Sequence, residues 1–156
     1  MIDLARVIEL PVAASEVWNV FWDVQRIAGC IPGCQDAQEV EPQHRYRATV
    51  RDRVGPYQVE MPIDVTVDAL EPGTRLALKA SGRDAVLASH VKVSMVVTLA
   101  PAGAGTSLTL QGKGEVGGKL AALGRSVVQR KTRDILDAFA ANVDRVFRRD
   151  SDTATA

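Results

Sequence analysis

The chain has 156 residues, a length typical of a single domain. Lysine plus arginine and aspartate plus glutamate number 19 each, so the formal net charge is zero, and aromatic residues make up only 4%. Nucleic-acid-binding proteins usually carry a basic surplus and aromatic residues for base stacking, so this composition argues against that class. Because no apolar run is long enough for a signal sequence or a transmembrane helix, we expect a cytoplasmic protein.

The N-terminal part of the chain predicts one strand followed by two short helices. The strand covers residues 2–10, and Arg6 is a charged exception on its apolar face. Helices are predicted over residues 15–23 and 24–30, where apolar residues recur at helical spacing. Pro32-Gly33 then marks a turn.

The middle of the chain alternates between apolar and polar residues, which is the period of strands. Glycine and proline mark the turns, as at Gly55-Pro56 and Pro72-Gly73. We expect Gly82-Arg83-Asp84 to break one strand, with an apolar loop over residues 85–87. The predicted strands are 38–41, 44–54, 57–69, 74–81, 89–100 and 106–116.

A single long helix is predicted over residues 119–147, because apolar residues recur there at steps of three and four. The stripe consists of Val128, Ile135, Phe139, Val143 and Val146. Leu120, Leu123 and Val127 form a second apolar patch, rotated about 120° from the stripe at 100° per residue. Thr132 interrupts the stripe.

This order of elements predicts an α+β fold. We expect a curved antiparallel sheet of about six to seven strands, wrapped around the long C-terminal helix, with two short helices after the first strand. The inward-facing Gly112 and Gly114 would let the sheet bend and leave space beneath the helix. A single domain is expected over residues 1–149, followed by a disordered polar tail over residues 150–156.

A row of four arginines follows one face of the strand predicted over residues 44–54: Arg45, Arg47, Arg51 and Arg53. If Gly55 and Pro56 are the central turn residues of a hairpin, Arg51 lies opposite Glu60, and Arg47 lies opposite Asp64. Exposed cross-strand ion pairs contribute from a few tenths to about 1 kcal/mol each. We favour ion pairing as the role of this row, and binding of an anionic membrane or a phosphate is the alternative.

Catalytic and metal-binding patterns are missing from the sequence. His44 and His90 are the only histidines, and His90 falls on an outward face with Lys92. The inward faces offer little for general acid–base catalysis apart from Asp52, near the end of a hairpin. No phosphate loop, dinucleotide fingerprint or nucleophile elbow occurs. We therefore expect neither an enzyme nor a metal or cofactor site.

Cys30 and Cys34 are the only cysteines. Two cysteines without neighbouring cysteine or histidine do not make a zinc site, which needs about four ligands. In the cytoplasm we expect both thiols to be reduced. We favour buried structural thiols over a redox pair.

The remaining functional signal is apolar space between sheet and helix. The inward-facing residues are mostly medium-sized aliphatic side chains with Met61 and Met95, a lining that suits a flexible or flat apolar molecule. Periodicity alone supports a cavity and a solid core equally. The expected cavity-lining residues are Ile27, Ile31, Met61, Ile63, Leu78, Leu87, Val93, Met95, Leu123, Val127, Thr132 and Leu136.

The second apolar patch on the last helix has two interpretations of equal weight. The loops at residues 30–32 and 83–87 either cover Leu120, Leu123 and Val127 as core, or form a mobile rim that guards a cavity mouth and meets a membrane or a partner. Thr132 also has two interpretations: its hydroxyl bonds back to the carbonyl of Val128, which we favour, or it contacts a ligand.

Five short motifs follow one another along the chain. They are Ile31-Pro32-Gly33-Cys34, Val54-Gly55-Pro56, Ala80-Ser81-Gly82-Arg83-Asp84, Gly105-Thr106-Ser107-Leu108 and Val116-Gly117-Gly118-Lys119-Leu120-Ala121-Ala122-Leu123-Gly124. In this order and spacing, the chain resembles the family of carbon monoxide dehydrogenase G subunits, over about residues 1–149. That family lies within the START and Bet v 1 superfamily, so the resemblance implies the helix-grip fold.

The resemblance also implies an accessory protein and not a catalyst. Such proteins accompany molybdenum hydroxylases of the carbon monoxide dehydrogenase type in maturation or membrane attachment, and superfamily relatives bind apolar molecules under the last helix. Some relatives carry a C-terminal hydrophobic anchor, whereas this chain ends in Ser151-Asp152-Thr153-Ala154-Thr155-Ala156. We therefore expect any attachment to be peripheral at the inner face of the membrane, through the rim, or to run through a partner.

The expected partners are an apolar small molecule, such as a quinone or a lipid, and a molybdenum hydroxylase. Two alternatives remain on the same fold. One is a polyketide cyclase or hydrolase-like enzyme, which would need inward acid–base groups. The other is a structural adaptor with a filled core and a protein-binding rim.

Overall fold

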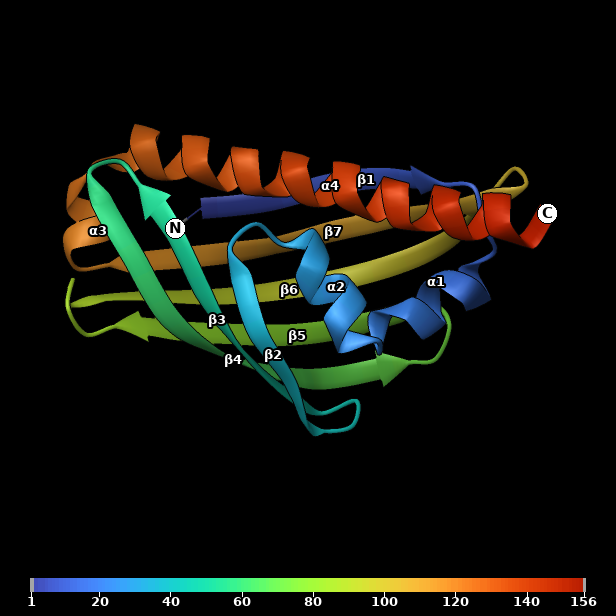
Figure 1. Cartoon of the computed structure of the whole chain (residues 1–156), viewed down its shortest axis with the longest axis horizontal. Helices are drawn as coiled ribbons and strands as arrows, with labels where there is room; N and C mark the ends of the chain where they lie inside the picture. The colour runs from blue at the N-terminus through green and yellow to red at the C-terminus, as the bar shows by residue number, and fades with distance from the viewer. Residues whose placement is uncertain (1, 156) are drawn as a thin grey trace.

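The computed structural model describes the backbone of residues 2–155 and the side chains of residues 2–148. Strand β1 (Ile2–Leu10) leads into helices α1 (Ala14–Phe21) and α2 (Val24–Cys30), as Figure 1 shows. The chain then forms β2 (Cys34–Glu41), β3 (Arg45–Val54), β4 (Tyr57–Glu71), β5 (Arg75–Asp84), β6 (Ser89–Ala102) and β7 (Gly105–Gly117). Helices α3 (Lys119–Ala122) and α4 (Arg125–Thr155) follow the last strand.

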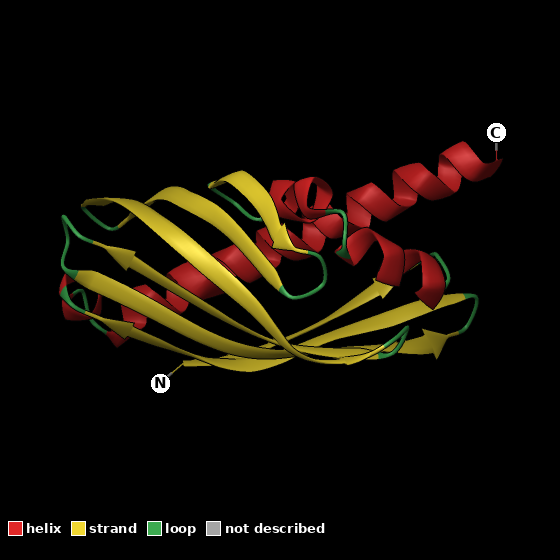
Figure 2. Ribbon diagram, turned by 90° about the horizontal axis from the view of Figure 1, so that it is seen from below, coloured by secondary structure: helices red, strands yellow, loops and turns green. Residues whose placement is uncertain are grey.

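The seven strands form one antiparallel sheet in the order β1-β7-β6-β5-β4-β3-β2. Figure 2 shows this sheet as a curved trough with α4 along its concave side. The α+β class, the curved sheet, the long C-terminal helix and the two short helices are therefore confirmed. The hairpin register is confirmed as well, since Val54 pairs with Tyr57 across Gly55-Pro56.

Strand β5 corrects one prediction. It runs through Gly82 and Arg83 to Asp84, where the sequence indicates a break. Gly82 lies in the strand because it pairs with Ile63 on β4, and a Cβ at this position would lie 2.2 Å from Ile63 Cδ1. The glycine thus makes room for a large neighbour and does not end the strand.

Strand β2 begins at Cys34 and not at residue 38, where alternation predicts its start. Its pairing with β3 shifts register between Gln35 and Gln38, and Asp36 in between has a φ of 54°. A strand with such a bulge does not alternate regularly. Periodicity therefore does not detect its first half.

The predicted single helix over residues 119–147 is in fact two helices. Helix α3 ends after Ala122, and Gly124, with a φ of 100°, turns the chain before α4 begins at Arg125. For Leu120 and Leu123, the apparent 120° rotation of the second apolar patch follows from this break, because they precede α4; Val127 belongs to α4 itself. At its other end α4 extends to Thr155, into the segment predicted as a disordered tail, whose side chains lie outside the described residues.

Two inward-facing glycines on β7 differ in what surrounds them. A Cβ on Gly112 would lie 2.1 Å from the backbone oxygen of Ser94 on β6, whereas a Cβ on Gly114 would meet its nearest atoms only at 3.8 Å. Gly112 therefore permits a close approach of two backbones within the curved sheet. Gly114 leaves room for a methyl group on the concave side.

This difference is testable by two matched substitutions. Gly112→Ala should lower the free energy of unfolding by about 1–3 kcal/mol, because backbone atoms of β6 must move to admit the methyl group. Gly114→Ala should leave stability within about 1 kcal/mol of the wild type, since the methyl group fits and the unfolded chain loses freedom. Urea denaturation of both variants measures the contrast, and equal losses would contradict the assigned role of Gly112.

The buried core divides into two clusters along the trough. The larger cluster lies between β1, β5–β7, α1, α2 and the C-terminal half of α4, around Val17, Leu108, Val143 and Phe147. The smaller cluster consists of Val59, Met61, Leu87 and Leu120, and lies at the α3 end of the sheet. No buried residue belongs to both clusters among the described residues.

Candidate functional site

The candidate site is the middle section of the trough, between the two core clusters. Two rows of paired residues cross the sheet there, and each contains small residues. One row runs Tyr46, Val65, Ala80, Val93, Gly114 and Ile2; the other runs Val67, Leu78, Met95, Gly112 and Leu4. The apolar side chains of β3–β6 in these rows face α4 but remain only half-buried.

The helix contributes the same kind of surface to the middle section. Val128, Thr132, Ile135 and Leu136 of α4 are all half-buried, although they belong to the helix's apolar stripe. Farther toward the C-terminus, Phe139 and Val146 of the stripe are also half-buried, whereas Val143 and the neighbouring Phe147 are 1% exposed. Apolar side chains thus face one another across the middle section without the burial found in the core.

The structure distributes the twelve predicted lining residues over three places. Met61, Ile63, Leu87 and Leu123 belong to the smaller cluster or pack against it. Ile27, Leu78 and Met95 pack against the larger cluster. The remaining five belong to neither: Ile31, Val93, Val127, Thr132 and Leu136. Val93, Thr132 and Leu136 lie in the middle section, with Leu78 and Met95 at its border.

The second apolar patch, made of Leu120, Leu123 and Val127, is divided between the core and the surface. Leu120 is 5% exposed and belongs to the smaller cluster, Leu123 packs against that cluster, and Val127 is 38% exposed. For Leu120 and Leu87 the core interpretation is therefore correct. The favoured interpretation of Thr132 is confirmed too, since its hydroxyl donates to the carbonyl oxygen of Val128 at 2.8 Å.

Two ion pairs join α4 to strands β1 and β3 on opposite sides of the trough. Arg6, the charged exception on β1, bonds to Asp137 of α4. Lys131 Nζ of α4 lies 2.7 Å from Asp52 Oδ2, on the inward face of β3. Burial opposes the charge of Asp52, but the hydrogen bonds from Lys131 and from the Arg53 N–H leave its pKa below the usual value. Asp52 is therefore a structural partner of α4 and not a solvated group at the hairpin end.

Aromatic side chains lie at the β3 end of the middle section. Tyr46, which begins one of the two rows, stacks on Trp22 with ring centroids 6.4 Å apart, and Trp18 meets Trp22 edge-on at 5.6 Å. The indole N–H of Trp22 is buried and has no hydrogen-bond partner within the described part of the chain. A buried donor without a partner costs free energy, and an acceptor that reached this N–H would offset that cost. Sequence patterns carry no signal for this group, because periodicity does not pair side chains from different elements.

Two hollows in the described molecular surface lie largely outside the middle section. One, of about 540 Å³, is lined mainly by outward-facing residues of β4–β7, including Lys79, Lys92 and Lys113. The other, of about 310 Å³, lies between α2 and α4 beside Cys30 and Arg145. Of the predicted lining residues, only Leu78 and Met95 border either hollow. The cavity under α4 therefore stays a prediction.

The loop between β5 and β6 is held by two buried polar residues whose role sequence patterns do not show. Asp84 is 3% exposed, and its carboxylate accepts the N–H groups of Glu60 at 2.9 Å and Leu87 at 3.0 Å. These bonds hold the pKa of Asp84 below its usual value. Ser89, 1% exposed, accepts the Leu120 N–H at 3.1 Å and donates to the Leu87 carbonyl. These bonds join the β5–β6 loop to β4 and to the start of α3.

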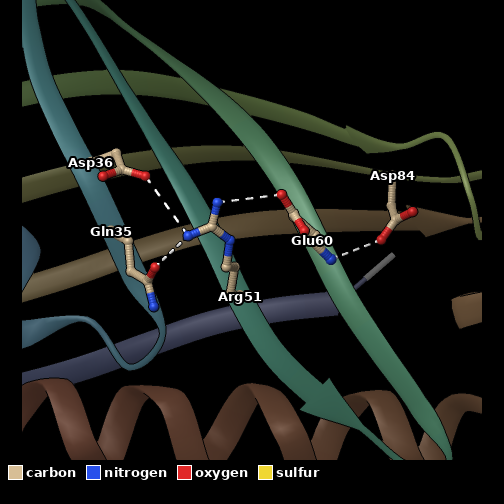
Figure 3. A network of polar contacts seen from close by, with 5 residues as sticks. All are labelled: Gln35, Asp36, Arg51, Glu60 and Asp84. Atoms are coloured by element: carbon tan, nitrogen blue, oxygen red, sulfur yellow. Dashed lines mark hydrogen bonds and ion pairs between the residues drawn. The ribbon is translucent and has the colours of Figure 1, made fainter.

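The arginine row makes the predicted ion pairs. Arg47 Nε lies 3.0 Å from Asp64 Oδ1, and Arg51 Nη2 lies 3.4 Å from Glu60 Oε1. Figure 3 shows Arg51 between β2 and β4, where it also donates to Gln35 at 2.6 Å. Because these side chains are exposed, each pair contributes little.

The two cysteines are both free thiols, and neither is fully exposed. Cys30 is buried and Cys34 half-buried, both are free, and burial raises the pKa of both thiols. Among the described residues, no group of three or more metal-ligating side chains occurs. No helix in the described part is long and apolar enough to cross a membrane.

Comparison with solved structures confirms the fold. The chain is similar to a conserved protein from Geobacillus kaustophilus, with 22% identity, 95% and 96% of the two chains covered and a TM-score of 0.85. It is also similar to a START superfamily protein from Mycobacterium smegmatis, with 13% identity, 94% and 97% coverage and a TM-score of 0.74. At these identities the likeness shows the fold alone. No curated protein sequence matches the chain.

The family is shown by a different comparison. The family model described as the carbon monoxide dehydrogenase G subunit (CoxG) matches residues 8–147. That range begins in β1 and ends in α4, so it includes nearly the whole trough, both core clusters and the middle section. The chain therefore belongs to the CoxG family of carbon monoxide dehydrogenase G subunits.

Proposed function

We propose that this protein is a non-catalytic accessory protein of a molybdenum hydroxylase of the carbon monoxide dehydrogenase type. In this role it holds an apolar ligand, such as a quinone or a lipid, between the sheet and α4, and assists maturation or membrane association of the enzyme. It works in the cytoplasm, peripherally at the inner face of the membrane. The family membership supports the accessory role and the partner.

One observation carries the ligand part of the proposal. In the middle section, apolar side chains of the sheet and of α4 lie half-buried on the concave side, between the two clusters of buried residues. Apolar surface left partly exposed on a concave face favours a binding role. An apolar molecule placed there would join the two clusters into one continuous core.

The polar groups at this site favour an apolar ligand that carries a hydrogen-bond acceptor. The buried Trp22 N–H lacks a partner in the described chain, and the stacked Trp22 and Tyr46 rings offer a flat aromatic surface. A ring carbonyl of a quinone satisfies both features, because it accepts a hydrogen bond and is part of a flat ring. A simple hydrocarbon would satisfy neither.

Uptake of a quinone tests the proposal. Protein purified without detergent should release an apolar molecule on solvent extraction, or should bind an added long-chain quinone, as measured by native mass spectrometry. Val93→Phe should weaken this binding at least ten-fold, because the larger side chain enters the middle section. Val96→Phe is the matched control, since Val96 lies on the same strand and borders the hollow on the opposite face.

Protein that is always empty and takes up neither quinones nor lipids would contradict the ligand part of the proposal. A marked loss of stability in Val93→Phe would point to the alternative of a structural adaptor with a filled interior. That alternative draws support from the surface hollows, since Leu78 and Met95 are the only predicted lining residues that border them. The cyclase or hydrolase alternative finds less support, because the inward Asp52 and Arg6 are engaged in ion pairs with α4.

A further inference from the structure

Three segments far apart in the sequence meet at the α3 end of the molecule. They are residues 53–57 at the β3–β4 hairpin, residues 83–90 at the β5–β6 loop, and residues 117–126 around α3, which Figure 1 shows together at one end of the trough. Gly55 lies beside Leu123, and Ser89 bonds to the N–H of Leu120. We call the surface of these three segments the α3 end.

The α3 end exposes apolar side chains on a fixed backbone. Val86 is 87% exposed, the highest value among the exposed large apolar residues of the described chain. Ala85, Ala88, Ala121 and Ala122 are exposed around it. Because Asp84 and Ser89 anchor the loop that carries Val86, the backbone at this position needs less ordering on binding.

The charges of the α3 end are all of one sign. Its exposed charged residues are Arg53, Arg83, Lys119 and Arg125. None of the four forms an ion pair with another described residue. The one acidic residue in the three segments, Asp84, is 3% exposed and takes its hydrogen bonds from the backbone. Positive charge on this surface is therefore uncompensated.

The opposite end of the trough is more acidic in its connecting segments, although the C-terminal half of α4 brings Arg145 and Arg148 toward that end. Its connecting segments, residues 9–16, 39–45, 71–75 and 101–105, contain Glu9, Glu16, Glu39, Glu41 and Glu71 against Arg45 and Arg75. The chain as a whole is neutral, so the positive charge of the α3 end reflects segregation and not a general basic surplus. Such a charge distribution orients the molecule at a charged surface.

We propose that the α3 end docks on a bilayer containing anionic lipids, with Val86 and the surrounding alanines against the interface and the four basic side chains at the headgroups. Apolar side chains within a basic surface are the combination that peripheral membrane binding uses. The proposal deepens the proposed function and rests on it, since a carrier of a membrane-soluble ligand must reach a bilayer. It also fixes which end of the trough meets that bilayer.

Flotation of the ligand-free protein with vesicles tests this surface. The protein should bind vesicles of phosphatidylcholine with phosphatidylglycerol, bind pure phosphatidylcholine vesicles weakly, and lose binding as salt is raised. The double variant Lys119→Glu/Arg125→Glu should bind at least about 25-fold more weakly, at roughly five-fold for each basic residue lost. Val86→Asp should also weaken binding, whereas Arg45→Glu at the opposite end should not.

Equal binding to both vesicle types, no binding to either, or unchanged binding of the double variant would each overturn the proposal. Loss of hydroxylase association in the double variant, without any vesicle binding by the wild type, would assign the surface to an acidic protein and overturn it as well. Circular dichroism checks that each variant is folded. Quinone uptake measured on the same samples separates the two proposals, because the double variant should retain it.

Discussion

Gly118→Ala should lower the free energy of unfolding by roughly 4 kcal/mol, enough to unfold many single domains. Gly118 has φ 80° and ψ −152°, a conformation open essentially to glycine alone. A Cβ there would also lie 1.9 Å from the backbone oxygen of Ala88. The substitution thus adds backbone strain to a clash with a backbone atom that no rotamer change relieves.

Gly124→Ala separates these two effects. Gly124 has a φ of 100°, but a Cβ at this position would meet nothing within 4 Å. Its replacement should therefore cost only the strain, about 1–2 kcal/mol. Urea denaturation of both variants at neutral pH gives the two values. A loss in Gly118→Ala no larger than in Gly124→Ala would contradict the close packing of the β5–β6 loop against the start of α3.

Asp84→Ala should cost about 4 kcal/mol, because it leaves the buried N–H groups of Glu60 and Leu87 without an acceptor. The backbone pairing of β4 with β5 ends at Ile63 and Gly82. Beyond that pair, the Asp84 carboxylate accepts the Glu60 N–H of β4 in place of a backbone carbonyl. Asp84→Asn keeps one acceptor and should lose less. Urea midpoints of the two variants and the wild type measure the order, and equal stability of all three would contradict this role.

The same carboxylate should make stability depend on pH. The pKa of Asp84 is lower in the folded protein than in the unfolded chain, where it is about 3.9. Its contribution is therefore complete above the unfolded-state pKa and is lost as the pH falls through the folded-state pKa. Unfolding at pH 7 and at pH 3 should differ less in Asp84→Asn than in the wild type. Asp52→Asn should narrow the difference as well, because Lys131 lowers the pKa of Asp52 at a separate site, and the two effects should add in the double variant.

The sheet is predictable from sequence because its signal is local. Alternation over β4 and β6 determines which side chains face the helix, and Gly55-Pro56 determines the register that pairs Arg51 with Glu60. The ion pairs of the arginine row need no other information. The helical period likewise predicts the C-terminal half of α4, whose Val143 and Phe147 are buried.

The rest depends on contacts between distant segments. The break at Gly124 is not evident from sequence, because a glycine inside an apolar period is compatible with a continuous helix. Asp84 resembles a turn residue in the sequence, since its donors Glu60 and Leu87 come together only after β4 and β5 pair. The exposed fraction of the side chains in the middle section depends on the distance between α4 and the sheet. No pattern along the chain encodes that distance.

The division of the core has a consequence for cooperativity. The smaller cluster joins α3 to β4 and the β5–β6 loop, and among the described residues it shares no buried member with the cluster around Phe147. Burial therefore couples the two ends only through half-buried residues, and we expect hydrogen exchange to resolve two levels of stability. In hydrogen exchange, amides of α3 and its loop then open at a lower free energy than those of β7 and the C-terminal half of α4. The α3 end, which we propose meets the membrane, is then expected to open locally while the rest of the molecule stays folded.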